Sequence, residues 1–125
     1  MNTQQYIDNL NKRFQTGISR EHAYRGDLQL VLETLLKDVQ VINEPARIEC
    51  GAPDYILTRK DIPVGYIEAK DVGVDLNSKS LKEQFDRYRA SLTNLIFTDY
   101  LDFHFYRDGV FVNSIRIAEI ANGAI

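Results

Sequence analysis

Residues 51–70 constrain the fold of this chain more than any other stretch. They read GAPDYILTRKDIPVGYIEAK, with two apolar, β-prone runs on either side of a polar link that contains Pro63. Such runs predict a β-hairpin. With the turn centred near Asp61, paired positions sum to about 122, which sets Asp54 opposite Glu68. Directly opposed residues hold their Cβ atoms roughly 4.5–5.5 Å apart, so the pattern brings two carboxylates together.

The second strand of this hairpin alternates between two faces. Glu68 and Lys70 share one face, while Ala69 points into the core. The two acids can hold a magnesium ion, whose oxygen ligands lie at about 2.0–2.1 Å. We expect the Ala69 carbonyl to serve as a further ligand, the Glu68 carboxylate to face outward from the core, and Lys70 to balance charge developing on a phosphoryl group. The alternative is a surface hairpin whose charges are only solvated.

Length and composition set broad bounds. A chain of 125 residues is one domain by length. Its net charge of −3 neither indicates nor excludes nucleic-acid binding, because local basic patches matter more than the total. One cysteine, Cys50, allows no internal disulfide and fits a reducing, cytoplasmic setting. The sequence shows neither a signal-peptide pattern nor the ~20-residue apolar run of a membrane span.

Two helices are predicted before the hairpin, over residues 3–14 with Thr3 as cap and over residues 20–37 with Ser19 as cap. The second helix opens on polar residues. Glu21 is a candidate to hold a metal-bound water, or else only favours the helix N-terminus electrostatically. The rival acid on this helix is Glu33. His22 fits a surface position or a phosphate contact better than a metal ligand, because no second histidine lies at ligand spacing.

Short strands are predicted over residues 39–42 and 46–50, the second of them beside the hairpin. After the hairpin, an apolar stripe predicts a helix over residues 78–92. This helix carries Gln84 and Tyr88, four residues apart on one face. A tyrosine in this position is also a common core residue.

The last third is rich in strands. Residues 93–98 form an apolar run suited to a central strand, and Asp108-Gly109 predicts a second hairpin between residues 103–106 and 110–112. A right-handed crossover through the helix over residues 78–92 places strand 93–98 parallel to strand 63–69. The predicted order is two helices, three strands, one helix and three strands, which makes an α/β sandwich with a mixed sheet.

Pro53-Asp54 followed by Glu68-Ala69-Lys70 resembles the paired motif of the PD-(D/E)xK nuclease superfamily. Gln84 and Tyr88, in that order on the next helix, make the chain similar to the RecB-like or Mrr-like branch. The resemblance implies a restriction-endonuclease-like three-layer core, with a central mixed β-sheet flanked by helices. It also implies a magnesium-dependent endodeoxyribonuclease in which manganese can substitute.

The resemblance further implies a role for each site residue. The expected catalytic residues are Asp54, Glu68, Lys70, Gln84 and Tyr88. The expected metal ligands are Asp54, Glu68, Ala69 and, through water, Glu21. The expected DNA contacts are Arg25, Lys82 and Arg87, although exposed cations are ordinary on any helix.

The early position of these motifs is similar to that in the N-terminal nuclease domain of large restriction-modification enzymes. We therefore expect one domain over residues 1–125, with residues 1–18 as a helical extension and residues 20–106 as the nuclease core. The domain is expected to belong to a longer polypeptide or complex with helicase, methyltransferase or specificity domains. Two alternatives remain open: a non-catalytic nuclease-fold module that binds nucleic acid or a protein partner, and an unrelated intracellular α/β interaction domain.

Overall fold

A computed structural model describes residues 1–19, 21–43, 51 and 53–125, without the side chains of residues 21 and 22, and this part of the chain contains a central sheet and three α-helices. Within these residues the elements in chain order are α1 (Thr3–Phe14), α2 (Glu21–Leu35), β1 (Gln40–Asn43), β2 (Tyr55–Arg59), β3 (Ile62–Ala69), η1 (Lys79–Leu81), α3 (Lys82–Ser91), β4 (Asn94–Thr98), β5 (Asp102–Arg107) and β6 (Val110–Arg116).

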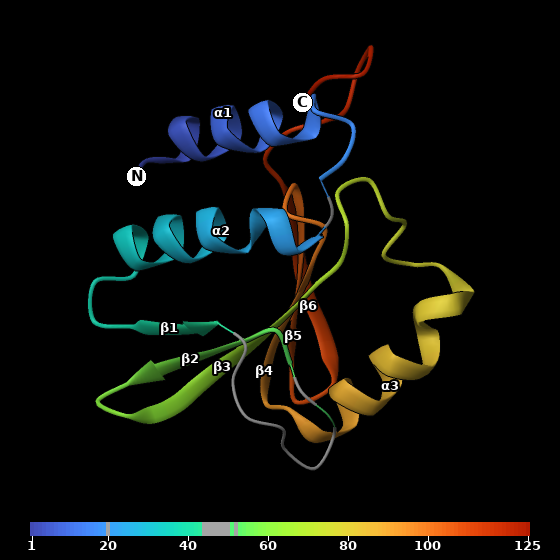
Figure 1. The fold of residues 1–125 in the computed structure, drawn as a ribbon. Helices are drawn as coiled ribbons and strands as arrows, with labels where there is room; N and C mark the ends of the chain where they lie inside the picture. The colour runs from blue at the N-terminus through green and yellow to red at the C-terminus, as the bar shows by residue number, and fades with distance from the viewer. Residues whose placement is uncertain (20, 44–50, 52) are drawn as a thin grey trace.

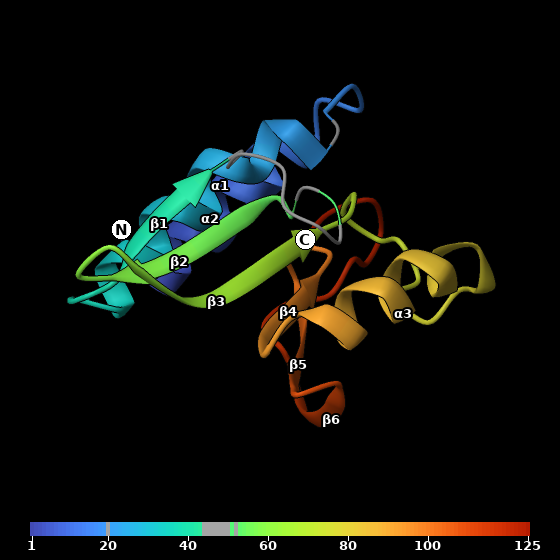
Figure 2. The ribbon, with the colours of Figure 1, turned by 90° about the horizontal axis from the view of Figure 1, so that it is seen from below.

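The described strands form one mixed sheet in the order β1-β2-β3-β4-β5-β6. Figure 1 shows α1 and α2 stacked over one part of this sheet and α3 beside its other part, and Figure 2 shows the same separation from below. The predicted α/β class with a central mixed sheet is confirmed, and the architecture is consistent with a restriction-endonuclease-like core.

The first hairpin has the register that the sequence predicted. Tyr55 pairs with Ile67 and Ile56 with Tyr66, so the pairing beside Asp54 is confirmed. The turn residues Lys60 and Asp61 both have positive φ, at 50° and 65°. Positive φ at both central residues is typical of a two-residue hairpin turn whose backbone twist matches the right-handed twist of the flanking strands. A register shift between Leu57 and Thr58 absorbs one extra residue of β3.

A crossover through η1 and α3 joins β3 to β4. These two strands run parallel, with Glu68 paired to Phe97 and Ala69 to Thr98, which confirms the predicted crossover. The second hairpin, β5–β6, turns at Asp108 and Gly109 as predicted. Strand β1, which comes from the predicted strand over residues 39–42, pairs with β2 beside the first hairpin; the other strand was predicted over residues 46–50. Residues 46–50 lie outside the described part of the chain.

Two buried clusters lie on the two faces of the sheet. The main cluster joins α1 and α2 to β1, β2 and β3, and includes Leu10, Leu28 and Ala69. The smaller cluster joins α3 to β4 and consists of Tyr88, Leu92, Leu95 and Phe97. Because neighbouring residues of a strand point to opposite faces, Ala69 packs under α2 while Glu68 points toward α3. The predicted inward orientation of Ala69 is confirmed.

Helix α1 is integral to the main core. Tyr6 and Leu10 are fully buried, and the Tyr6 hydroxyl donates to the Tyr100 carbonyl at 2.7 Å. The predicted cap was wrong: Asn2 caps α1, because its side chain accepts from the Gln5 amide while the Gln5 side chain accepts from the Asn2 amide. This reciprocal pair is a capping box, which satisfies two amide donors at the helix start.

Candidate active site

Four polar side chains meet at the carboxyl end of β3. Asp54 directly precedes β2, Glu68 lies in β3, Lys70 follows β3, and Gln84 lies in the first turn of α3. The antiparallel hairpin sets the start of β2 beside the end of β3, and the crossover brings α3 over the same end. Three separate segments of sequence therefore converge at one place.

Glu68, Lys70 and Gln84 form a closed triangle of hydrogen bonds. Lys70 Nζ donates to Glu68 Oε2 at 3.1 Å and to Gln84 Oε1 at 2.6 Å. Gln84 Nε2 donates to the same Glu68 Oε2 at 2.8 Å. The predicted shared face of Glu68 and Lys70 is confirmed by this contact. Each partner fixes the rotamer of the other two, which is the kind of pre-organisation that catalytic groups need.

Asp54 is held from both sides. Its Oδ2 accepts from the Ala69 amide at 2.7 Å, and its Oδ1 accepts from the Arg25 guanidinium. Arg25 is only 8% exposed, so this is an ion pair between two largely desolvated groups. The backbone bond ties Asp54 to the end of β3, and the ion pair ties it to α2.

Glu68 is buried, so the prediction that its carboxylate faces outward was wrong. The residue is 4% exposed, because α3 covers this end of β3. Burial raises the pKa of Glu68 to about 7; the charge of Asp54 raises it too, while Lys70 works in the opposite direction. A carboxyl group with such a pKa exchanges protons near neutrality, which is typical of functional sites.

The second oxygen of Glu68 bears on metal binding. Within the described residues, Glu68 Oε1 is buried and has no hydrogen-bond partner. A buried oxygen of this kind is costly unless something else satisfies it. A divalent cation held by Asp54 and Glu68 would do so, since magnesium binds through one or two carboxylates and keeps several waters. Among the described residues, no three His, Cys, Asp or Glu side chains are grouped so that they could hold a metal ion.

The other predicted site residues lie in different surroundings. Tyr88 is buried in the smaller core cluster with Leu92 and Phe97, where core packing accounts for its position. Lys82 and Arg87 lie exposed on α3, Lys82 paired with Asp86 at 2.5 Å. The Glu21 and His22 side chains are outside the described part. The rival acid Glu33 accepts from the Val41 amide at 3.5 Å, at the far end of α2 from Arg25.

The contact between Arg25 and Asp54 was missed from the sequence, from which Arg25 was expected to contact DNA. Arg25 lies next to Tyr24 and three residues before Leu28, and both of these are buried. A cation at the edge of a buried helical stripe is a signal that it has an internal partner, because an unpaired buried charge is very costly. Asp54, which follows Pro53 in the sequence, is that partner.

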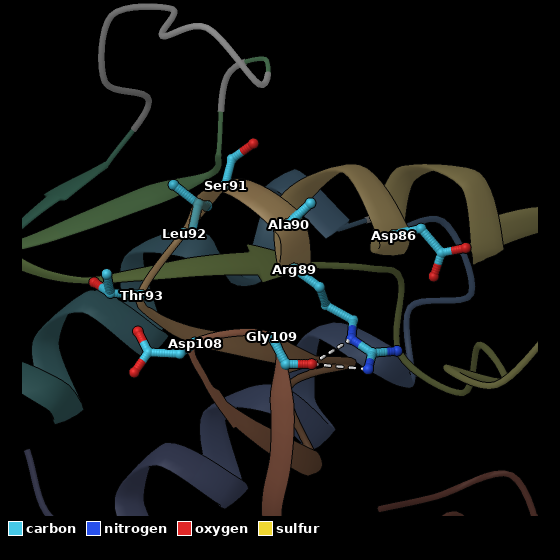
Figure 3. A pocket seen from close by; sticks show the side chains of 8 residues that line it. All are labelled: Asp86, Arg89, Ala90, Ser91, Leu92, Thr93, Asp108 and Gly109. Atoms are coloured by element: carbon cyan, nitrogen blue, oxygen red, sulfur yellow. Dashed lines mark hydrogen bonds between the residues drawn. The ribbon is translucent and has the colours of Figure 1, made fainter.

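A pocket of about 480 Å³ lies at the opposite end of α3 from Gln84 (Figure 3). It is lined by Asp86, Arg89, Ala90, Ser91, Leu92, Thr93, Asp108 and Gly109. Figure 3 shows the Arg89 guanidinium turned to the Gly109 carbonyl, to which Nε and Nη2 donate at 3.1 and 2.8 Å. None of the four converging side chains lines this pocket, so it is separate from the candidate active site.

No protein-family model matches the chain, and no curated protein matches it either. Among solved structures, the chain is similar to a chain of the cryo-electron microscopy structure of a DrdV–DNA complex, with a TM-score of 0.69 and 21% sequence identity. The match covers 92% of this chain and 87% of that chain. At this level of identity the likeness establishes a shared α/β fold.

Proposed function

We propose that this domain is a metal-dependent endonuclease module that hydrolyses DNA phosphodiesters, acting as the cleavage part of a restriction-modification enzyme. The observation that carries the proposal is the convergence of Asp54, Glu68, Lys70 and Gln84 at one sheet edge, with a buried Glu68 oxygen left for a ligand. The shared fold with a chain from a DNA complex supports DNA as the substrate.

Each residue has a role in this proposal. Asp54 and Glu68 are the carboxylate ligands of magnesium or manganese, with the Ala69 carbonyl beside them and Glu21 acting through water. The bound cation would polarise a phosphoryl oxygen and lower the pKa of a water. Lys70 donates toward the anionic phosphoryl group, and its position between Glu68 and Gln84 orients its ammonium group. Gln84 holds both neighbours in place.

Base recognition is assigned to other domains in this proposal. Lys82 and Arg87, exposed on α3, are the proposed contacts to DNA phosphates. Contacts of this kind position a duplex without reading its sequence. Specificity, helicase or methyltransferase domains in the same polypeptide or complex would supply selection of the target.

A specific observation favours a second candidate, a non-catalytic module of the same fold. Asp54 already accepts from Arg25 and the Ala69 amide, and Lys70 already donates to two partners. These four contacts form without substrate, although Glu68 Oε1 has no hydrogen-bond partner within the described residues. Under this alternative the domain binds DNA or a protein partner but does not cleave.

Cleavage of supercoiled plasmid in magnesium, in manganese and in a chelator separates the two candidates. Cleavage should require the cation and should be lost in Asp54→Ala and Lys70→Ala, while the matched α1 variants Asp8→Ala and Lys12→Ala should cut at the wild-type rate. Calorimetric titration with manganese gives a second measure, which Asp54→Ala should abolish. DNA binding without cleavage or metal binding would favour the non-catalytic module.

A further inference from the structure

Arg25 occupies the position of a counter-ion inside the proposed metal site. Its guanidinium donates to Asp54 Oδ1, and both side chains are about nine-tenths buried, at 10% and 13% exposure. The Arg25 carbonyl also accepts from the Tyr55 hydroxyl at 3.0 Å, so the residue is fixed at its backbone as well as at its side chain. Tyr55 directly follows Asp54, so the backbone and the side chain of Arg25 contact two consecutive residues.

Charge balance explains what this contact does. Asp54 and Glu68 bring two acidic groups to a desolvated site, and Arg25 and Lys70 bring two cations to the same atoms. Without a metal, the charges of these four groups balance when both acids are ionised, although Glu68 Oε1 has no hydrogen-bond partner within the described residues. A divalent cation adds two positive charges, so its affinity depends on how strongly Arg25 already holds Asp54.

We propose that Arg25 is a positioning residue that stands in for the metal: it neutralises Asp54 in the metal-free protein and competes with the divalent cation for that carboxylate. This inference rests on the proposed metal site and adds a regulator of its affinity. The competition keeps the affinity for the cation low, and it keeps the metal-free site folded with two acids close together.

The competition predicts the direction in which the affinity for the cation changes when Arg25 is replaced. Two like charges a few ångströms apart repel one another strongly at the effective dielectric constant of a partly buried site. Removing the charge of Arg25 should therefore tighten cation binding by on the order of tenfold or more. The same change should destabilise the metal-free protein, because Asp54 loses the cation that compensates its charge and keeps, within the described residues, only the Ala69 amide.

The test measures manganese affinity by calorimetry and the unfolding temperature in chelator, for wild type, Arg25→Gln, Arg25→Met and Arg25→Lys. Arg25→Gln should unfold at a lower temperature in chelator and bind manganese at least tenfold more tightly. Arg25→Met is the second variant if glutamine does not fold, and it should show the same tightening. Arg25→Lys keeps the charge and should stay within about threefold of wild type.

Arg13→Gln is the matched control, since it removes an ion pair of α1 with buried Asp27, at 2.6 Å and away from the site. It should lower stability and leave manganese affinity unchanged. If the wild type binds manganese and both Arg25→Gln and Arg25→Met bind it equally well or more weakly than the wild type, the inference is overturned. The proposed metal site would still stand, because the wild type binds the ion. Binding by no variant, wild type included, would overturn both. Binding by Arg25→Gln and Arg25→Met but not by the wild type would support the inference, with Arg25 excluding the cation.

Discussion

Gln84 Nε2 donates to Glu68 Oε2 at 2.8 Å, across sixteen residues of sequence and from the first turn of α3 to the end of β3. This bond makes the helix part of the site rather than a cover over it. The same glutamine accepts from Lys70, so it holds an acid and a cation with one amide group. A glutamine is suited to this place because its side chain carries both a donor and an acceptor.

Replacing Gln84 by alanine should therefore loosen both neighbours. We expect Gln84→Ala to lower the cleavage rate by about 10- to 100-fold and to cost about 1.5–3 kcal/mol of stability, as for hydrogen bonds to charged groups. Single-turnover cleavage and urea unfolding measure the two effects. Gln29→Ala is the control, because Gln29 donates to the Val41 carbonyl at 3.1 Å on α2. A full cleavage rate in Gln84→Ala would contradict the role given to the amide.

The pKa of Glu68 makes stability depend on pH in the metal-free protein. Its pKa in the folded state is raised from 4.5 to about 7, so the folded protein binds more protons than the unfolded chain between these values. The free energy of unfolding should then fall as pH rises from about 4.5 to 7, by at most about 3 kcal/mol. Unfolding in chelator at several pH values measures this fall.

Glu68→Gln should remove that fall, because an amide does not ionise. The variant should fold at neutral pH, match or exceed the wild type in chelator, and lose cleavage. Glu83→Gln, at an exposed acid in the first turn of α3, is the matched control and should keep the wild-type pH dependence. The same decline in Glu68→Gln as in wild type would show that another group causes it.

Removing Asp54 alone should leave Arg25 without its ion pair to this carboxylate. Arg25 is only 8% exposed, and breaking a buried ion pair by removing one partner is strongly destabilising, so Asp54→Ala should cost about 3–5 kcal/mol. The double variant Asp54→Ala, Arg25→Met should recover part of this loss, because both members of the pair are then gone. Urea unfolding of the two single variants and the double variant gives the coupling energy. Additive losses would argue against a specific pair.

Exposed cations of α3 should set the salt dependence of DNA binding. Replacing Lys82 and Arg87 by glutamine should weaken binding and reduce the slope of log affinity against log salt by about 1.8, if each contacts one phosphate. The control is Lys12→Gln with Lys37→Gln, which changes the charge equally at exposed positions on the α1 and α2 side. Equal slopes for both double variants would place the DNA elsewhere on the molecule.

The local sequence pattern was sufficient to predict which strands carry the site residues and how these strands pair. The register of the first hairpin follows from the two apolar runs and a short polar turn, and this register alone sets the start of β2 beside the end of β3. The parallel pairing of β3 with β4 follows from the handedness of crossovers. Together these two rules gave the relative positions of Asp54, Glu68 and Lys70.

Tertiary packing decided what local pattern did not. Glu68 occupies a face that alternation correctly assigned, yet its burial depends on how closely α3 packs over that face. The partner of Arg25 depends on which turn of α2 reaches the end of the sheet, which no periodicity specifies. Two neighbouring polar residues, Asn2 and Thr3, could each cap α1, and the reciprocal hydrogen bonds with Gln5 make Asn2 the cap.

The bond from the Tyr6 hydroxyl to the Tyr100 carbonyl has a practical consequence for dissecting this protein. An expression clone that begins at residue 20, where the motif-bearing part starts, would lack α1 and so leave Tyr24 and Leu28 with less cover. Such a fragment would tend to aggregate and to be degraded, and its inactivity would then say nothing about the chemistry. A useful boundary lies ahead of Asn2, so that the helix keeps its capping box.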